Sequence, residues 1–149
     1  MTEIAATVDS AALVPAKTTT TVALDFGRIT LGNDLMLYLF GAPGQPRFHF
    51  MWSDLCRGAI GAVVLVDTRR LEDCFEAVDY FERLELPFLV AVNCFFGTPN
   101  HTVEQVREAL AIPANVPVLL CDARERDSTK LMLIELVQYA LELASSNAV

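Results

Sequence analysis

The residues best placed to do chemistry in this sequence lie in a Gly/Pro turn that follows an apolar run. The run Leu35–Phe40 is followed directly by Gly41-Ala-Pro-Gly-Gln45. The apolar run is typical of a strand, and the glycines and the proline end it in a tight loop. Such a loop presents the backbone N–H of Gly44 and the side-chain amide of Gln45 to a ligand. We therefore expect a binding site at the end of this strand.

Polar residues also follow two later apolar runs. Asn93 follows Pro87–Val92, and Asp122 with Ala123 follows Pro117–Cys121. In open, mostly parallel sheets, ligands bind beyond the carboxyl ends of the strands. The loops expected to converge at that edge are 41–45, 67–70, 93–97 and 121–126.

The order of the predicted elements defines the fold class. From Gly61 onward, strands and helices alternate, which specifies a parallel α/β sheet with right-handed crossovers. Before it, Gly32-Asn33-Asp34 is a hairpin signal, so the first two strands are expected to be antiparallel neighbours. The predicted strands are 22–26, 35–40, 62–66, 87–92 and 117–121. The predicted helices are 48–56, 71–81, 102–111 and a last helix capped by Asp127 or Ser128 that runs to Ala144.

Composition disfavours several function classes. The chain has 149 residues, a formal net charge of −8 and two lysines, Lys17 and Lys130. Electrostatic binding to nucleic acid needs clustered cations, so we expect no nucleic-acid partner. The apolar runs are far shorter than the ~20 residues that span a bilayer, so we expect no direct membrane insertion. The four cysteines lack Cys-x-x-Cys spacing, and we expect reduced thiols packed in the core of a cytosolic protein.

The motifs occur in the order in which they occur in Ras-like small G proteins. Each motif is weak alone, whereas their order and spacing are specific. The chain resembles the bacterial Ras-like ATP/GTP-binding proteins of the actinobacterial conservons, which are relatives of the gliding-motility GTPases. This resemblance implies the three-layer α/β fold of P-loop NTPases and small G proteins, with a mostly parallel sheet. It covers residues 17–143 and rests on 18–27, the Phe-Gly-Ala-Pro-Gly-Gln loop, 61–67, 92–94 and 119–123.

The resemblance implies phosphate-side roles for three residues. Thr21 matches the switch-one threonine that binds magnesium and the γ-phosphate, and Gly44 matches the glycine whose N–H meets the γ-phosphate. Gln45 matches the catalytic glutamine that orients the attacking water. The cofactors implied are GTP or GDP and Mg²⁺. The same residues are also compatible with a strand-start threonine, a turn glycine and a solvated loop glutamine.

On the base side, the resemblance is partial. Asn93 matches the first residue of the Asn-Lys-x-Asp motif, but Cys94 replaces its lysine and Phe96 replaces its aspartate. A phenylalanine accepts no hydrogen bond from guanine, so selection of guanine over adenine loses its main physical cause. Asp122 and Ala123 match the fifth motif, whose backbone N–H contacts the base, although Asp122 could equally be a solvated loop residue.

The largest departure is the absence of a phosphate-binding loop. That loop needs Gly-x-x-x-x-Gly-Lys-[Ser/Thr], but no glycine occurs before Gly27. In addition, Gly41 stands where the family usually has an aspartate that holds magnesium through water. We therefore expect an N-terminally truncated G domain at 17–149, with its first strand and P-loop missing and a loose segment at 1–16. Without the central strand, two neighbouring strands would have free edges, so self-association is expected.

Two functions are compatible with these features. In the first, the chain is a GTPase-like regulatory switch subunit of a bacterial signalling complex, impaired in nucleotide binding and inactive as a hydrolase. In the second, it is a nucleotide-independent interaction module that keeps the switch surface. The resemblance implies two partners, a roadblock-type small protein and a sensor-kinase-like membrane protein. It also implies a cytoplasmic location, peripheral at the inner membrane face through these partners.

Two other readings of the sequence are disfavoured. A receiver domain could use Asp67 as phosphoacceptor, but no lysine follows Pro117–Cys121 before the last helix. Asp25-Phe26-Gly27 spells a kinase-like triplet, but no glycine-rich loop or His-Arg-Asp precedes it.

Overall fold

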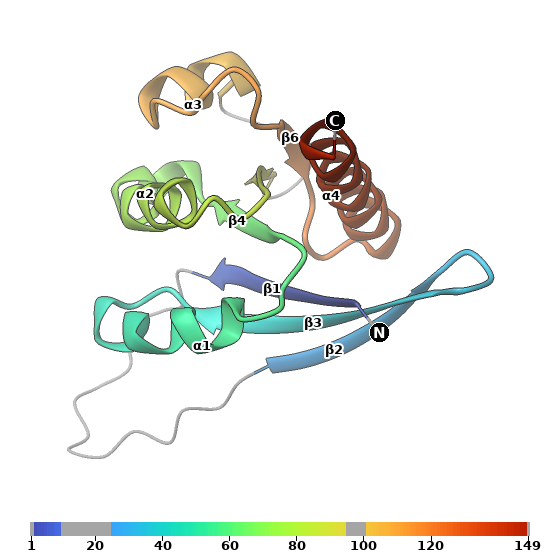
Figure 1. The fold of residues 1–149 in the computed structure, drawn as a ribbon. Coiled ribbons are helices and arrows are strands. Elements are labelled where there is room, and N and C mark those ends of the chain that lie inside the picture. The colour runs from blue at the N-terminus through green and yellow to red at the C-terminus, as the bar shows by residue number, and fades with distance from the viewer. Residues whose placement is uncertain (1, 10–24, 95–100, 149) are drawn as a thin grey trace.

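A single mostly parallel sheet organises the chain. The computed structural model describes residues 2–9, 25–94 and 101–148, and of 2–9 only the backbone. The strands are β1 (Thr2–Asp9), β2 (Asp25–Leu31), β3 (Leu35–Pro43), β4 (Ala62–Val66), β5 (Phe88–Asn93) and β6 (Val118–Cys121). Within the described residues they form one sheet in the order β2-β3-β1-β4-β5-β6. Neighbouring strands are parallel except for the antiparallel pair β2–β3 at one edge (Figure 1). The predicted α/β fold with a mostly parallel sheet is confirmed.

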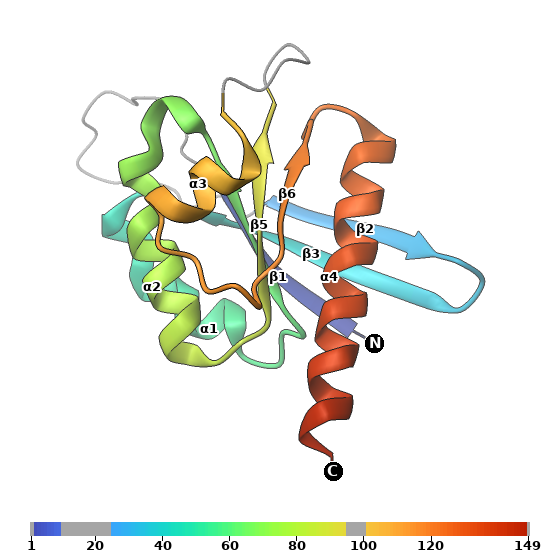
Figure 2. The ribbon, with the colours of Figure 1, turned by 90° about the horizontal axis from the view of Figure 1, so that it is seen from above.

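Helices cover both faces of the sheet. They are the 3-10 helices η1 (Pro46–Met51) and η2 (Thr68–Cys74), and α1 (Trp52–Cys56), α2 (Phe75–Leu84), α3 (Val103–Ala109) and α4 (Arg126–Asn147). Along β4, Val64 and Val66 pack into one core with residues of α1, α2 and α3, and Val63 packs into a second core with residues of α4. The central strands are therefore apolar on both faces, as in a buried parallel sheet. The helices lie in two layers, with α4 on its own side (Figure 2).

The central strand position is filled, contrary to the prediction. The first strand was expected to be missing and 1–16 to be loose, but Thr2–Asp9 forms β1 between β3 and β4. Its backbone pairs in parallel with β3 from Leu37 to Pro43 and with β4 at Val63. The prediction of free edges on β3 and β4 is therefore wrong. Unpaired backbone groups in the middle of a sheet need hydrogen-bond partners, and the extended segment Thr2–Asp9 supplies them. Residues 10–16 lie outside the described residues.

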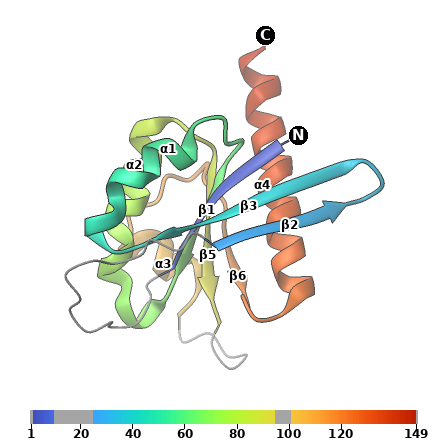
Figure 3. The ribbon, with the colours of Figure 1, turned by 90° about the horizontal axis from the view of Figure 1, so that it is seen from below.

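The hairpin between β2 and β3 is confirmed, although β2 spans Asp25–Leu31 whereas the predicted strand was 22–26. Asp25 pairs with Gly41 and Leu31 pairs with Leu35, so the two strands run antiparallel over the whole of β2. In the connecting turn, Gly32 has φ 66°, a conformation that glycine adopts without strain. The hairpin projects past α4 (Figures 2 and 3).

The starts of the last two helices show which capping predictions hold. The helix predicted to begin at Thr102 is α3, and Thr102 caps it, because its hydroxyl accepts from the N–H of Gln105, and Gln105 Oε1 accepts from the N–H of Thr102. The predicted cap of α4 is wrong. That helix begins at Arg126, one residue before Asp127, and the hydroxyl of Ser128 instead accepts from the N–H of Asp122 at 3.0 Å.

The four cysteines pack as the composition predicted. Cys56, Cys74, Cys94 and Cys121 are all buried, and none forms a disulfide. Burial raises the pKa of Cys56 and of Cys74 to about 11, so both thiols stay protonated at neutral pH. Among the described helices, none has the length and apolar character needed to cross a membrane.

Candidate functional site

Asn93 and Ala123 lie side by side at the carboxyl edge of the sheet. Asn93 ends β5 and pairs with Cys121, which ends β6. The backbone N–H of Ala123 donates to Asn93 Oδ1 at 3.2 Å. The side-chain oxygen of Asn93 therefore fixes the loop after β6. The structure thus brings together two of the residues that the sequence placed on the base side.

The carboxylate of Asp122, the third of these residues, is hydrogen-bonded to the neighbouring Arg124. Its carboxylate accepts from Arg124 Nε at 3.0 Å, from Arg124 Nη2 at 2.8 Å and from the backbone N–H of Arg124 at 3.0 Å. These bonds lower the pKa of Asp122 below its ordinary value, with the side-chain bond to Arg124 as the main cause. The carboxylate is therefore ionised, and it must leave Arg124 before it can bind a base.

The same arrangement recurs after β4. Asp67 accepts from Arg69 Nε at 2.9 Å, from Arg69 Nη2 at 2.8 Å and from the backbone N–H of Arg69 at 2.9 Å. The side-chain bond to Arg69 is the first cause of the lowered pKa of Asp67. Two arginines at the carboxyl edge of the sheet are thus each bonded to a neighbouring carboxylate. The Asp-x-Arg spacing in both loops was the sequence signal for these pairs, and it was missed.

On the other side of the edge, Gly44 and Gln45 follow β3 directly. Gln45 Oε1 accepts from Arg47 Nε at 2.8 Å, so the atom expected to orient water is bound within the chain. The carbonyl of Gly44 lies 3.3 Å from Nε2 of His49. Pro46 begins η1, and its missing N–H makes it suited to the first turn.

His49 links the loop of Gly44 and Gln45 to α2. Its Nδ1 lies 3.0 Å from Oε2 of Glu76, in the first turn of α2, while its Nε2 faces the carbonyl of Gly44. Its ring packs against that of Trp52, with centroids 4.0 Å apart. No sequence pattern indicated these contacts, because His49 is an isolated histidine and its partner Glu76 lies in another helix. Its contacts make it a positioning residue for the loop of Gly44 and Gln45.

Two strands separate the two halves of the edge. Between β3, which leads into Gly44, and β5, which ends at Asn93, lie β1 and β4. Three strand spacings give a separation of about 14 Å. This is comparable with the distance from the base to the terminal phosphate of an extended nucleoside triphosphate. No backbone–backbone hydrogen bond links the two halves within the described residues.

The described residues hold no cluster of metal-ligating side chains. They contain no group of three or more His, Cys, Asp or Glu side chains that could hold a metal ion. Gly41 faces Asp25 across the strand pair, and a Cβ at Gly41 would lie 3.1 Å from the Cβ of Asp25. An aspartate at 41 would therefore crowd Asp25. Thr21 and Phe96 lie outside the described residues, so their predicted roles stay predictions.

Comparison with known families assigns the chain to one of them. The family described as "Conserved hypothetical ATP binding protein" matches residues 1–143. The chain belongs to that family. Its match includes both halves of the carboxyl edge, from Gly44 to Ala123. The motifs indicated a likeness to small G proteins, and the family that the chain belongs to is described as ATP-binding.

The curated proteins similar to this chain include an archaeal protein and a Ras-related protein. The uncharacterized protein MJ1339 of Methanocaldococcus jannaschii is 31% identical over 75 residues, which are 49% of this chain and 48% of that protein. The Ras-related protein SEC4 of Candida albicans is 26% identical over 133 residues, 83% of this chain and 63% of that protein. The chain thus spans 48% of the length of the first relative and 63% of the length of the second. The Ras-related match agrees with the small-G-protein-like α/β fold.

Proposed function

We propose that this chain is a GTPase-like, nucleotide-binding switch subunit of a bacterial signalling complex. The observation that carries the proposal is the hydrogen bond from the N–H of Ala123 to Asn93 at the carboxyl edge of the sheet. It joins the positions of the fourth and fifth G-protein motifs where a base would bind. The family description and the likeness to a Ras-related protein support a nucleotide as the ligand.

The nucleotide would lie along the edge, with its base at Asn93 and Ala123 and its phosphates toward Gly44. Without a P-loop, the phosphates lose several charge-assisted hydrogen bonds, each worth about 1.5–3 kcal/mol. Every 1.4 kcal/mol corresponds to about a tenfold change in Kd, so a tight site becomes millimolar or weaker. Arg69 and Arg124 do not compensate fully, because each is bonded to its own aspartate. Mg²⁺ would arrive with the nucleotide, since the described residues offer it no site.

The switch would act through the loop after β3. Gln45 is bonded to Arg47, and the carbonyl of Gly44 faces His49, which is also paired with Glu76 of α2. A terminal phosphate at the N–H of Gly44 would pull this loop toward the ligand and away from these contacts. The position of α2 would then depend on the phosphate. A ligand shifts such an equilibrium only through a difference in its affinity for the two loop positions.

A second function, a nucleotide-independent interaction module, is favoured by exposed aromatic side chains. Phe26 is 60% exposed and Phe50 is 70% exposed. Phe26 packs against Tyr38 and Phe40 of the neighbouring strand, with ring centroids 5.8 and 5.2 Å apart. Aromatic anchors dominate the binding energy of many protein interfaces. The partner proposed for this surface is a roadblock-type small protein. A sensor-kinase-like membrane protein would bring the complex to the inner face of the membrane.

Ligand-observed NMR with GTP separates the two functions. We expect saturation transfer from the protein to the GTP base protons, with a Kd on the order of 1 mM. Asn93→Ala should weaken binding at least about fivefold, whereas Asn147→Ala, an exposed asparagine at the end of α4, should not change it. Absence of transfer at about 10 mM GTP would leave only the nucleotide-independent module.

A further inference from the structure

A groove lies at the end of the sheet opposite the nucleotide edge. Its volume is about 350 Å³, and it lies where β5 and β6 begin, between the end of α2 and the second half of α4. Its floor contains the buried side chains of Phe81, Phe88 and Val116. Ligand pockets of proteins measure about 300–1,000 Å³, so this groove has room for a few side chains rather than a large cofactor.

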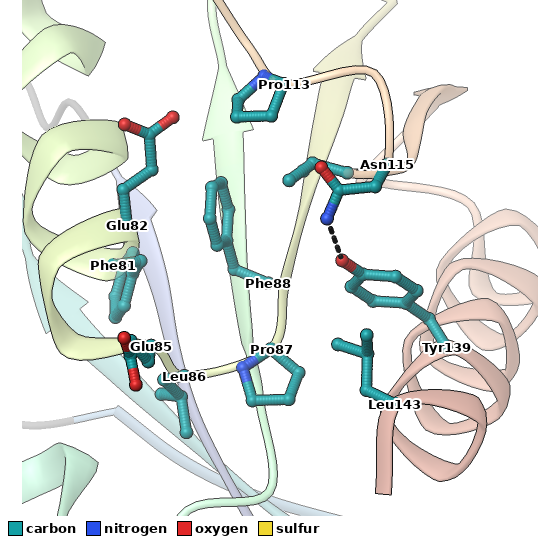
Figure 4. A pocket seen from close by; sticks show the side chains of 11 residues that line it. Phe81, Glu82, Glu85, Leu86, Pro87, Phe88, Pro113, Asn115, Tyr139 and Leu143 are labelled. Atoms are coloured by element: carbon teal, nitrogen blue, oxygen red, sulfur yellow. Dashed lines mark hydrogen bonds between the residues drawn. The ribbon is translucent and has the colours of Figure 1, made fainter. Parts of the chain in front are cut away.

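The polar groups of the groove stand on two opposite walls. Glu82 and Glu85 lie on the wall formed by the end of α2, while Asn115 and Tyr139 lie on the other, with Phe88 between them (Figure 4). Asn115 Nδ2 donates to the hydroxyl of Tyr139 at 3.4 Å. One wall is therefore neutral, with its polar atoms bonded to each other. The other wall carries both negative charges of the lining.

The two carboxylates have no partner within the described chain. Both glutamates are exposed, and neither forms an ion pair or a side-chain hydrogen bond to a described residue. Glu85 also stands at the C-cap of α2 with φ 56° and ψ 22°, where glycine is the favoured residue. The residues that line the groove include no lysine, arginine or histidine. The groove thus combines an apolar floor with an uncompensated negative wall.

We propose that this groove docks a basic peptide segment of a partner protein. An apolar residue of the segment would pack on Phe88 and Val116, and an arginine beside it would bind Glu82 and Glu85. An arginine suits this site because its guanidinium binds carboxylates bidentately and stacks on aromatic faces. Complementary charge favours this occupant, since the lining carries two carboxylates and the whole chain a net charge of −8. The site is separate from the carboxyl edge, so it does not depend on nucleotide binding.

Titration of the full chain with two short peptides tests this proposal. The probes are acetyl-Leu-Arg-Leu-Arg-Leu-amide and the same peptide with citrulline in place of arginine, which keeps the shape and removes the charge. We expect ¹⁵N–¹H shifts centred on the amides of Glu85, Leu86, Val116 and Tyr139. The arginine peptide should bind at least about fivefold more tightly than the citrulline peptide, because charged bonds are the stronger ones.

Two variants and a control decide the role of the carboxylates. Glu82→Gln/Glu85→Gln should remove the preference for arginine, and Leu143→Arg, which places a cation at the groove, should also remove it. Glu72→Gln/Glu104→Gln makes the same charge change at exposed sites outside the groove lining and should leave the preference intact. Equal binding of the two peptides, shifts centred on another surface, or an unchanged preference in the groove variants would overturn the proposal.

Discussion

Asn93 Oδ1 accepts a hydrogen bond from the backbone N–H of Ala123, 3.2 Å away, and so joins the end of β5 to the loop after β6. The two residues are 30 positions apart in the sequence. The bond holds the loop that carries Asp122 and Arg124 beside the carboxyl end of β5. Asn93 is therefore a positioning residue of the proposed base site even before any ligand binds.

Removal of this bond should lower the stability of the chain. Asn93→Ala loses one partly exposed hydrogen bond, so we expect the free energy of unfolding to fall by about 0.5–1.5 kcal/mol. Asn93→Asp keeps an acceptor oxygen and should lose less. Urea unfolding followed by circular dichroism measures both. Equal losses in the two variants would show that the acceptor is not what matters.

The chain should not hydrolyse GTP. It lacks a P-loop, and the side-chain oxygen of Gln45 is held by Arg47. We expect single-turnover phosphate release from GTP to equal the rate in buffer, and Arg47→Ala, which frees Gln45, not to raise it. Turnover above buffer that Gln45→Ala abolishes would contradict this prediction.

Guanine and adenine nucleotides should bind with similar affinity. Phe96 stands at the base-reading aspartate position of the motif, and the carboxylate of Asp122 is bonded to Arg124. Competition between GTP and ATP should therefore give Kd values within about tenfold, or 1.4 kcal/mol. A hundredfold preference for GTP would mean that Asp122 leaves Arg124 and reads the base, and Asp122→Asn would then remove the preference.

The pair of Asp67 and Arg69 should make stability depend on acid pH. The pKa of Asp67 is lowered in the folded chain, chiefly by the bond to Arg69. Its contribution is therefore present above the unfolded pKa of about 3.9 and is lost as pH falls through the lower folded pKa. Asp67→Ala, which also removes the bond to the N–H of Arg69, should cost about 1 kcal/mol at pH 7. Unfolding measured from pH 7 to 2 should show this difference shrinking below about pH 4. A difference that stays constant down to pH 2 would contradict the assignment.

The sequence predicted the strands that are apolar on both faces, together with the order of the elements. Ala62–Val66 is a strand with the predicted bounds, and the Gly32 turn joins β2 to β3 as expected. Local pattern was sufficient there because burial on both faces leaves few other conformations for such runs. It was not sufficient for β1, since Thr2–Asp9 shows no period and becomes a strand through pairing with β3 and β4.

For the candidate site, the sequence predicted where the residues would lie in the fold but not their contacts. Motif order led to Gly44, Gln45, Asn93 and Ala123, all of which follow or end strands at the carboxyl edge. It did not show that Gln45 is bonded to Arg47, because a flexible side chain two residues away has many rotamers. The role of His49 was missed for a similar reason, since its partner Glu76 lies in another helix.

The most direct test of the proposed function maps GTP binding onto the amides of the chain. In a ¹⁵N–¹H titration of the full chain to about 10 mM GTP, the amides of Gly44, Asn93 and Ala123 should shift together. They should fit a single Kd on the order of 1 mM. Shifts confined to other surfaces, or none at all, would contradict a nucleotide site at the carboxyl edge of this sheet.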